Sequence, residues 1–191
     1  DLMAAIAAKL GLTLEIVDME FDSLPTALSN GQIDVIAAGY TVKPDREETM
    51  DFSDSYYTAA QTIIVLKDSK ITTADDLKDK VIGVQTGTTG SWNAADYTTE
   101  DKIKGFANGM LAVEALKNGQ VDAVIIDNNP AESYADENPD TLVLIENQFA
   151  AEDYALAVAK GNAVLLEKIN TALAEMKADG SFDAIIAKYI K

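Results

Sequence analysis

The 191-residue chain contains no cysteine and no histidine. The first absence excludes disulfides, thiol nucleophiles, and zinc or iron–sulfur sites built on cysteine. The second excludes Ser-His-Asp triads, imidazole bases and histidine-bound metals. Most familiar hydrolase and metalloenzyme mechanisms are therefore excluded. We expect no cofactor, no metal site and no catalytic residue.

Basic residues are scarce, with 15 Lys and Arg against 32 Asp and Glu, a net charge of −17. A surface of this sign repels phosphate backbones and anionic lipid, so we expect no nucleic-acid partner. No apolar run approaches the roughly 20 residues needed to cross a bilayer, and no signal-peptide pattern begins the chain. The hydrophobic residues, 48% of the total, are spread along the whole length and predict a folded globular protein.

Strand and helix patterns alternate along the chain, which predicts an α/β fold with parallel sheets. The run IDVIAAG is typical of a parallel strand covered on both faces. We expect strands at 13–19, 33–39, 61–67, 81–85, 102–106, 121–127, 142–146 and 154–160. We expect helices at 2–10, 21–31, 72–79, from about 91, at 109–118 and 131–137, and through most of the chain after 160.

One segment occurs twice: LSNGQIDVI (28–36) matches LKNGQVDAV (116–124) at an offset of 88. Each copy reads as a helix end, an Asn-Gly cap and a buried strand. The alternative is convergence on a common turn. A true repeat would give two similar α/β lobes with Gly39 and Asp127 at equivalent strand ends, where α/β proteins bind ligands.

The first candidate binding cluster is Gly39-Tyr40-Thr41 followed by Arg46. A glycine at a strand end lets a ligand approach the backbone, and the fork of an arginine fits a carboxylate. The alternative for Arg46 is a surface ion pair, since acidic residues are plentiful between positions 45 and 54.

Further candidates follow other predicted strands. The turn from Gln85 to Gly90 offers N–H groups at a helix start and the hydroxyls of Thr88 and Thr89, an anion site or a plain turn. Asp127 ends an apolar strand and could bind an ammonium group or cap the next helix.

Phe21 could stack on a ligand or fill the core. Taken together, the clusters suit a zwitterion, with its carboxylate at Arg46 and its ammonium at Asp127.

Four segments in order resemble the polar amino-acid binding proteins of ABC importers, the type II periplasmic solute-binding proteins. They are AAGYTVKPDREETMDFSDSYY (37–57), VIGVQTGTTGS (81–91), LKNGQVDAVIID (116–127) and EDYALAVAKG (152–161). The resemblance implies two α/β lobes, with parallel or mixed sheets flanked by helices, that close on an amino acid. It places lobe 1 at 1–60 and 160–191, lobe 2 at 67–153, and hinge strands near 60–67 and 153–159.

The resemblance also implies roles for the candidates. Arg46 would bind the α-carboxylate, helped by the backbone of Thr41 and Thr89. Asp127 would hold the α-ammonium, with Gly39 as a further acceptor. The full set of ligand-binding residues expected is Phe21, Gly39, Tyr40, Thr41, Arg46, Gln85, Thr88, Thr89 and Asp127, with Phe21 and Gln85 facing the ligand side chain.

The implied function is extracytoplasmic binding of a free amino acid for delivery to ABC permease subunits, by a periplasmic or lipid-anchored extracellular protein that is not an enzyme. The alternatives are an enzyme resembling cyclohexadienyl dehydratase and the ligand-sensing domain of a receptor.

The family has a strand and an aromatic loop before the helix that opens this chain, so roughly 25–30 residues are absent by that comparison, together with any signal sequence. We expect the gap in lobe 1 to be filled by a partner segment, through strand exchange or a dimer, or lobe 1 to be damaged.

Overall fold

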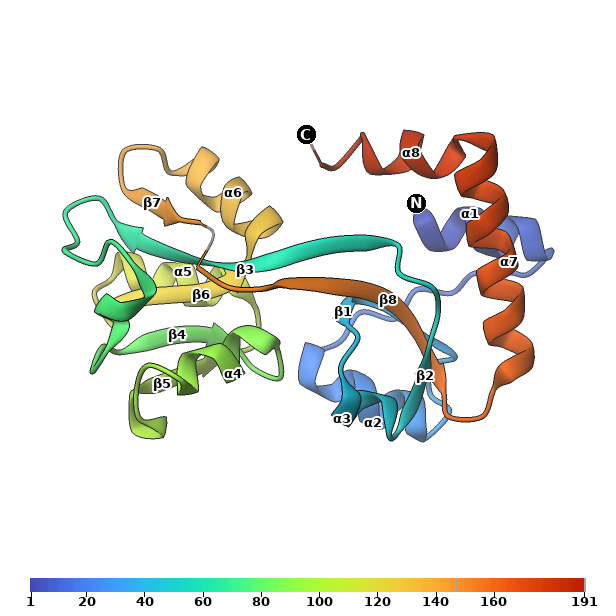
Figure 1. Cartoon of the computed structure of the whole chain (residues 1–191), viewed down its shortest axis with the longest axis horizontal. Coiled ribbons are helices and arrows are strands. Elements are labelled where there is room, and N and C mark those ends of the chain that lie inside the picture. The colour runs from blue at the N-terminus through green and yellow to red at the C-terminus, as the bar shows by residue number, and fades with distance from the viewer. Residues whose placement is uncertain (147, 191) are drawn as a thin grey trace. The chain divides into compact units, whose positions relative to one another are not determined.

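The computed structural model describes residues 1–146 and 148–190, and the chain forms two compact units (Figure 1). Unit 1 comprises Asp1–Met19, Ser23–Thr58 and Asp153–Lys191, and unit 2 comprises Glu20–Asp22 and Ala59–Glu152. Two strands, β3 (Tyr57–Leu66) and β8 (Ala151–Ala159), each carry the chain from one unit into the other.

Unit 1 is built on a three-stranded antiparallel arrangement. Its central strand β8 pairs with β1 (Val35–Thr41) on one side and with β2 (Met50–Phe52) on the other. Its helices are α1 (Leu2–Leu10), α2 (Leu24–Ser29), α3 (Pro44–Glu47), α7 (Ala163–Asp179) and α8 (Ser181–Ile186). The core joins α1, β8 and α7 through Ile6, Leu156, Val158, Ile169, Leu173 and Met176.

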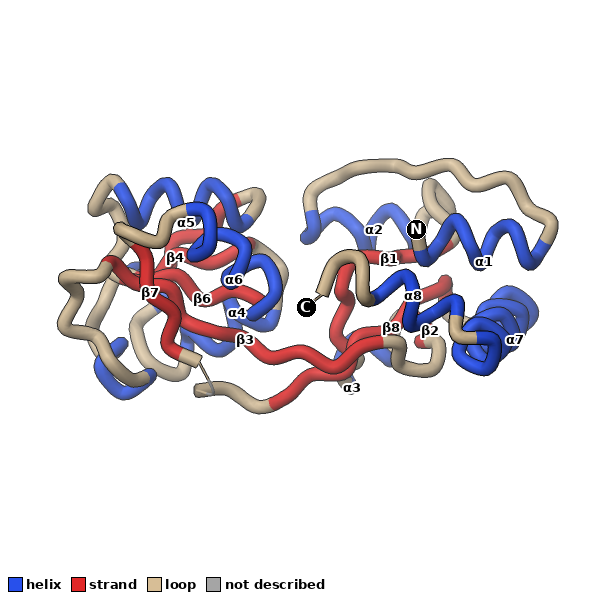
Figure 2. The backbone as a smooth tube through the Cα atoms, turned by 90° about the horizontal axis from the view of Figure 1, so that it is seen from above, coloured by secondary structure: helices blue, strands red, loops and turns tan. Residues whose placement is uncertain are grey.

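Unit 2 contains a mixed sheet in the order β7–β3–β6–β4–β5, where β7 is Leu142–Ile145, β6 Ala123–Asp127, β4 Ile82–Gln85 and β5 Ile103–Phe106. β4 runs parallel to β5 and β6, whereas β3 is antiparallel to β6 and β7. Its helices are α4 (Thr89–Ala95), α5 (Gly109–Lys117) and α6 (Asn128–Glu137), with short 3-10 turns at Phe21–Ser23, Ala74–Leu77 and Glu100–Lys102 (Figure 2).

The sheet of unit 2 has an apolar core on each face. Ile63 and Ile125 pack on one side with Ala94 of α4, while Ile64 and Val124 pack on the other with α5 and α6 residues. Strands buried on both faces need apolar residues at consecutive positions. This explains the consecutive buried, non-polar residues at 82–84 and 123–126.

The two copies of the Asn-Gly segment adopt the same turn. Gly31 and Gly119 have φ values of 67° and 68°, a left-handed conformation that glycine tolerates best. The N–H of Gln32 bonds to the carbonyl of Ala27, and that of Gln120 to Ala115, both at 2.9 Å. The repeat thus encodes one helix-to-strand turn, used once in each unit.

Two strand predictions are wrong. Residues 13–19 form no strand, and Ile16 and Val17 are 81% and 48% exposed, because no neighbouring strand pairs with this segment among the described residues. β1 starts at Val35, two residues later than predicted, and it is antiparallel rather than parallel. Ala37 and Ala38 in its middle are exposed, so its apolar residues are not covered on both faces.

Within the residues that the structure describes, no helix combines the length and the apolar character that crossing a membrane requires.

Candidate functional site

Arg46 is the only arginine in the sequence, and it is buried. Its Nη1 donates a 2.9 Å hydrogen bond to the carbonyl of Thr41, and its guanidinium carbon lies 4.0 Å from the centre of the Tyr40 ring. The neighbouring Asp45 and Glu47 are exposed. A buried guanidinium differs from the usual surface ion-pair partner, whose charged group stays in contact with water.

Gly39 sits in β1 with a φ of 58°, and an added Cβ would lie 3.3 Å from the Tyr154 ring. Its N–H donates to the hydroxyl of Tyr56 at 3.2 Å. The positive φ and the packed ring explain why a glycine occupies this position. Thr41, two residues on, is buried.

The turn after β4 is held by its own side chains. Thr88 precedes the first residue of α4, and its hydroxyl donates to the carbonyl of Gln85 at 2.8 Å. Thr89 is 2% exposed, and its hydroxyl donates to a carboxylate oxygen of Glu152 at 2.7 Å. The Gln85 side chain donates weakly to the carbonyl of Ala107 at 3.4 Å. The hydroxyl of Thr88 thus shapes the turn, whereas that of Thr89 joins the start of α4 to β8.

Asp127 ends β6 and caps α6, since its Oδ1 accepts from the N–H of Asn129 at 3.3 Å. The capping alternative is therefore confirmed. Parallel pairing of Val84 with Ile125 brings the ends of β4 and β6 to one edge of the sheet.

The structure groups the candidates within each unit. Gly39, Tyr40, Thr41 and Arg46 lie together in unit 1, and Gln85, Thr88, Thr89 and Asp127 lie at one sheet edge of unit 2. Phe21 opens a 3-10 turn in the short segment counted with unit 2 and is half-buried.

Two polar residues near the unit 2 group were not singled out from the sequence. Glu152 accepts a hydrogen bond from the hydroxyl of Thr89. The sequence EDY around Glu152 contains no signal that predicts this contact. Gln61 is 3% exposed and stands opposite Asp127 in the β3–β6 register. Its Oε1 has no hydrogen-bond partner among the described residues. A polar residue starting the apolar run QTIIVLK was the available signal.

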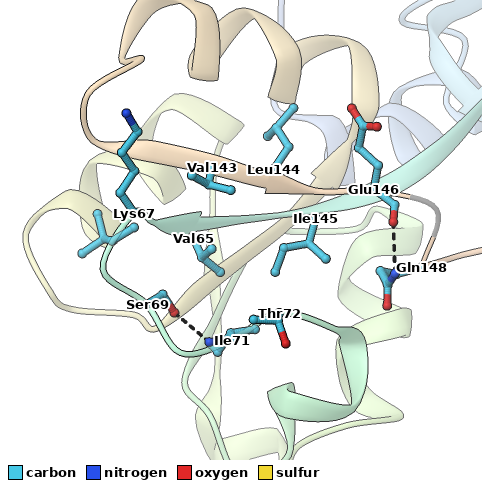
Figure 3. Close-up of a pocket in the computed structure, with 11 residues that line it drawn as sticks. Val65, Lys67, Ser69, Ile71, Thr72, Val143, Leu144, Ile145, Glu146 and Gln148 are labelled. Atoms are coloured by element: carbon cyan, nitrogen blue, oxygen red, sulfur yellow. Dashed lines mark hydrogen bonds between the residues drawn. The ribbon is translucent and has the colours of Figure 1, made fainter.

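A surface pocket of about 510 Å³ opens elsewhere on unit 2 (Figure 3), and none of the candidates lines it. Ser69 already accepts from the N–H of Ile71, and Gln148 donates to the carbonyl of Glu146. With these polar groups engaged internally, the pocket specifies no ligand chemistry. Its lining is Val65, Leu66, Lys67, Ser69, Ile71, Thr72, Val143, Leu144, Ile145, Glu146 and Gln148.

Acidic side chains do not gather into a metal-binding group anywhere in the described part of the chain.

Comparison with known protein families gives one match along the full sequence. Residues 1–191 match the bacterial extracellular solute-binding proteins, family 3.

Characterised relatives fall in one functional class. The chain is 36% identical to a probable histidine-binding protein of Neisseria gonorrhoeae, over 99% of this chain and 72% of the relative. It is 35% identical to the arginine-binding extracellular protein ArtP of Bacillus subtilis, over 99% and 75%. The ABC transporter glutamine-binding protein GlnH of the same organism is 40% identical over 86% and 60%.

Solved structures agree in fold. An ancestral arginine-binding protein bound to arginine superposes with a TM-score of 0.94 at 42% identity, covering 100% of this chain and 86% of the other. The arginine-, lysine-, histidine-binding protein ArtJ of Geobacillus stearothermophilus gives a TM-score of 0.94 at 36% identity, over 99% and 83%. These relatives are binding proteins and not enzymes.

Proposed function

The chain belongs to family 3 of the bacterial extracellular solute-binding proteins, and we propose that it binds a free polar amino acid outside the cytoplasm and delivers it to the permease subunits of an ABC importer. The observation that carries this proposal is the family match along all 191 residues, joined to relatives named for arginine, histidine and glutamine. A periplasmic or lipid-anchored location belongs to the same proposal.

The α-carboxylate of the ligand is bound by Arg46, with the backbone of Thr41 and Thr89. Burial of Arg46 and its 2.9 Å bond to the Thr41 carbonyl support this role, because they hold the guanidinium beside the backbone of Thr41. A charge-assisted pair in a desolvated site is strong and geometrically selective.

The α-ammonium is bound by the Asp127 carboxylate, with the Gly39 carbonyl and the Thr41 hydroxyl as further acceptors. Phe21 and Gln85 contact the ligand side chain, and Thr88 shapes the turn beneath it. The capping contact of Asp127 supports this, because it fixes the carboxylate at the sheet edge.

Binding closes two lobes, one at 1–60 and 160–191 and the other at 67–153, around hinges near 60–67 and 153–159. Support comes from β3 and β8, inside each of which the chain passes from one compact unit to the other. Hinges of few residues suit a rigid-body closure.

Ligand-induced thermal stabilisation tests the proposal with each of the twenty amino acids. A ligand at a thousand times its Kd adds about 4.1 kcal/mol of stability, or a Tm rise on the order of 10 °C at this chain length. We expect that shift with arginine, histidine or glutamine, its loss in Arg46→Ala and Asp127→Asn, and its retention in the exposed-site control Asp136→Asn. Absence of any shift would contradict the proposal.

An enzyme of the dehydratase type is the second candidate, and it needs a carboxylic acid whose pKa is raised. Incubation with a cyclohexadienyl acid separates the candidates: release of an aromatic product would favour the enzyme.

The sensing domain of a receptor would bind the amino acid as well as a transport protein does. It would fail, however, to support uptake of that amino acid with a permease.

We also infer that the outer edge of β1 accepts a strand exchanged between two copies of the chain. β1 ends the strand order, with β8 its one partner among the described strands, and Leu12, Ile16 and Val17 are exposed nearby in sequence. Unpaired edges recruit strands, and lysine on an edge prevents it. Light scattering should show a dimer fraction that falls in Ala38→Lys. A monomer at every concentration would contradict the inference.

A further inference from the structure

The ring of Tyr40 is buried and packs against two other side chains. It is 2% exposed, stacks against Phe52 with ring centroids 6.1 Å apart and planes 15° from parallel, and carries the guanidinium of Arg46 4.0 Å above its ring centre. Tyr40 thus contacts both the ring of Phe52 and the guanidinium of Arg46.

The strand register explains how the two rings meet. Tyr40 pairs with Ala155 of β8, and Phe52 pairs with Ala157 of the same strand from its other side. Paired residues share one face of a sheet, and so do residues two apart. The two alanines between the rings are fully buried and small, which leaves room for the rings to pack across the central strand.

A buried guanidinium needs compensation for the water it loses. The negative face of an aromatic ring supplies part of it, more so where water is excluded. The Thr41 carbonyl supplies a hydrogen bond at 2.9 Å. A ring packed against a guanidinium also restricts the orientation of its plane.

We propose that Tyr40 is a positioning residue for carboxylate recognition: its ring, backed by Phe52, holds the Arg46 fork in the plane that pairs with the ligand α-carboxylate. This rests on the proposed function, in which Arg46 binds that carboxylate. Tyr40 contacts Arg46 rather than the ligand. Tyr40 therefore affects ligand binding only through the orientation of Arg46.

The orientation role makes a prediction that a packing role does not. Removing the ring should weaken ligands that have an α-carboxylate more than ligands in which an uncharged amide replaces it, because the planar two-bond pairing is lost for the carboxylate alone. A general loss of packing would weaken both ligands by the same factor.

Calorimetric titration with L-arginine, L-glutamine and L-histidine, each beside its α-carboxamide, measures this. Tyr40→Leu should lower affinity for the amino acid by roughly 5- to 30-fold and reduce the preference for acid over amide. Tyr40→Phe keeps the ring face and should retain the preference. Tyr97→Leu removes an aromatic ring in unit 2 that packs edge-on against Phe149, and it should leave the preference unchanged.

An unchanged acid-to-amide preference in Tyr40→Leu would overturn the inference while the proposed function stands, since the wild type still binds. If Tyr40→Leu fails to fold, Phe52→Leu decides: it removes the backing ring, and an unchanged preference there overturns the inference. If the wild type binds none of the six probes, the proposed function and the inference fall together. If Arg46→Lys keeps the full preference, the assigned role of Arg46 fails.

Discussion

Gly90 shows how closely the first turn of α4 approaches the strands beneath it. A Cβ at this position would lie 2.7 Å from Oε1 of Gln61 and 2.9 Å from the carbonyl oxygen of Ile125. The side chain can shift, but the backbone of a central strand cannot, so α4 must pack against β6 through a residue without a side chain.

Gly90→Ala should therefore destabilise the protein although alanine favours helix. Overpacking typically costs about 1–3 kcal/mol, which exceeds the roughly 1 kcal/mol that alanine gains over glycine in a helix. Urea unfolding should show the loss. Ser91→Ala, on the same helix, should change stability by under about 0.5 kcal/mol, and a stabilised Gly90→Ala would contradict the close packing.

Some single residues can be predicted from composition and turn chemistry. Gly31 and Gly119 were predicted as caps from Asn-Gly alone, and the motif resemblance pointed to Arg46. The orientation of Tyr40 was not predictable, because a continuous apolar run does not say which side chain faces the core. The hydrogen bond between Thr89 and Glu152 joins residues 63 positions apart. A contact of this range cannot be predicted from local sequence patterns.

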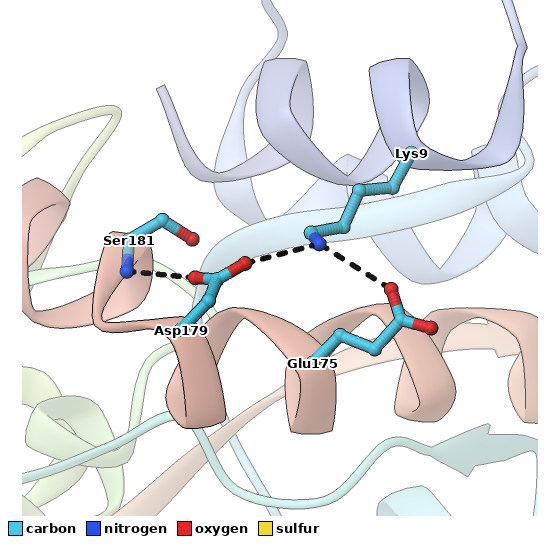
Figure 4. Close-up of polar contacts among 4 residues, drawn as sticks. All are labelled: Lys9, Glu175, Asp179 and Ser181. Atoms are coloured by element: carbon cyan, nitrogen blue, oxygen red, sulfur yellow. Dashed lines mark hydrogen bonds and ion pairs between the residues drawn. The ribbon is translucent and has the colours of Figure 1, made fainter.

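Two elements far apart in sequence, α1 and α7, are joined by charge (Figure 4). Lys9 lies 3.2 Å from Asp179 and 3.3 Å from Glu175. Ser181 beside the end of α7 and then Lys9 hold the pKa of Asp179 at about 2. The backbone N–H of Ser181 donates to the Asp179 carboxylate at 2.9 Å. The Ser181 hydroxyl oxygen has no hydrogen-bond partner among the described residues.

This contact should make stability fall in acid. The folded-state pKa of Asp179, about 2, lies below its ordinary value of 3.8, so its contribution is present above pH 3.8 and is lost as pH falls towards 2. Tm should drop more steeply over this range in the wild type than in Asp179→Asn. The control Asp136→Asn should follow the wild type, and parallel curves for Asp179→Asn and wild type would contradict the assignment.

The strands show where sequence patterns stop being informative. The runs at 81–85 and 121–127 are strands, and both are buried on two sides, as their composition predicts. The run at 13–19 has equally suitable residues and forms none, because a strand exists only through its neighbour. The boundaries of the two lobes likewise depend on packing, and they stay a prediction.

At the scale of the whole molecule, the net charge of −17 is a source of self-repulsion. Raising NaCl from 10 to 150 mM shortens the screening distance from about 30 to about 8 Å. The Tm should rise, because screening of the overall repulsion outweighs the weakening of exposed pairs such as Lys117 with Glu114, each worth about 1 kcal/mol or less. A Tm that falls over this range would show that attractive pairs dominate.

The discontinuous layout of unit 1 has a consequence for biosynthesis. Nearly all of unit 2 is one uninterrupted stretch, Ala59–Glu152, whereas the central strand of unit 1 is supplied largely by residues after it. On the ribosome, unit 2 can fold as soon as it emerges. At that stage β1 and β2 still lack β8, the strand with which both of them pair. Strands β1 and β2, made before unit 2, are thus organised after it. A nascent chain halted before Asp153 would hold one finished unit and two strands without their common partner.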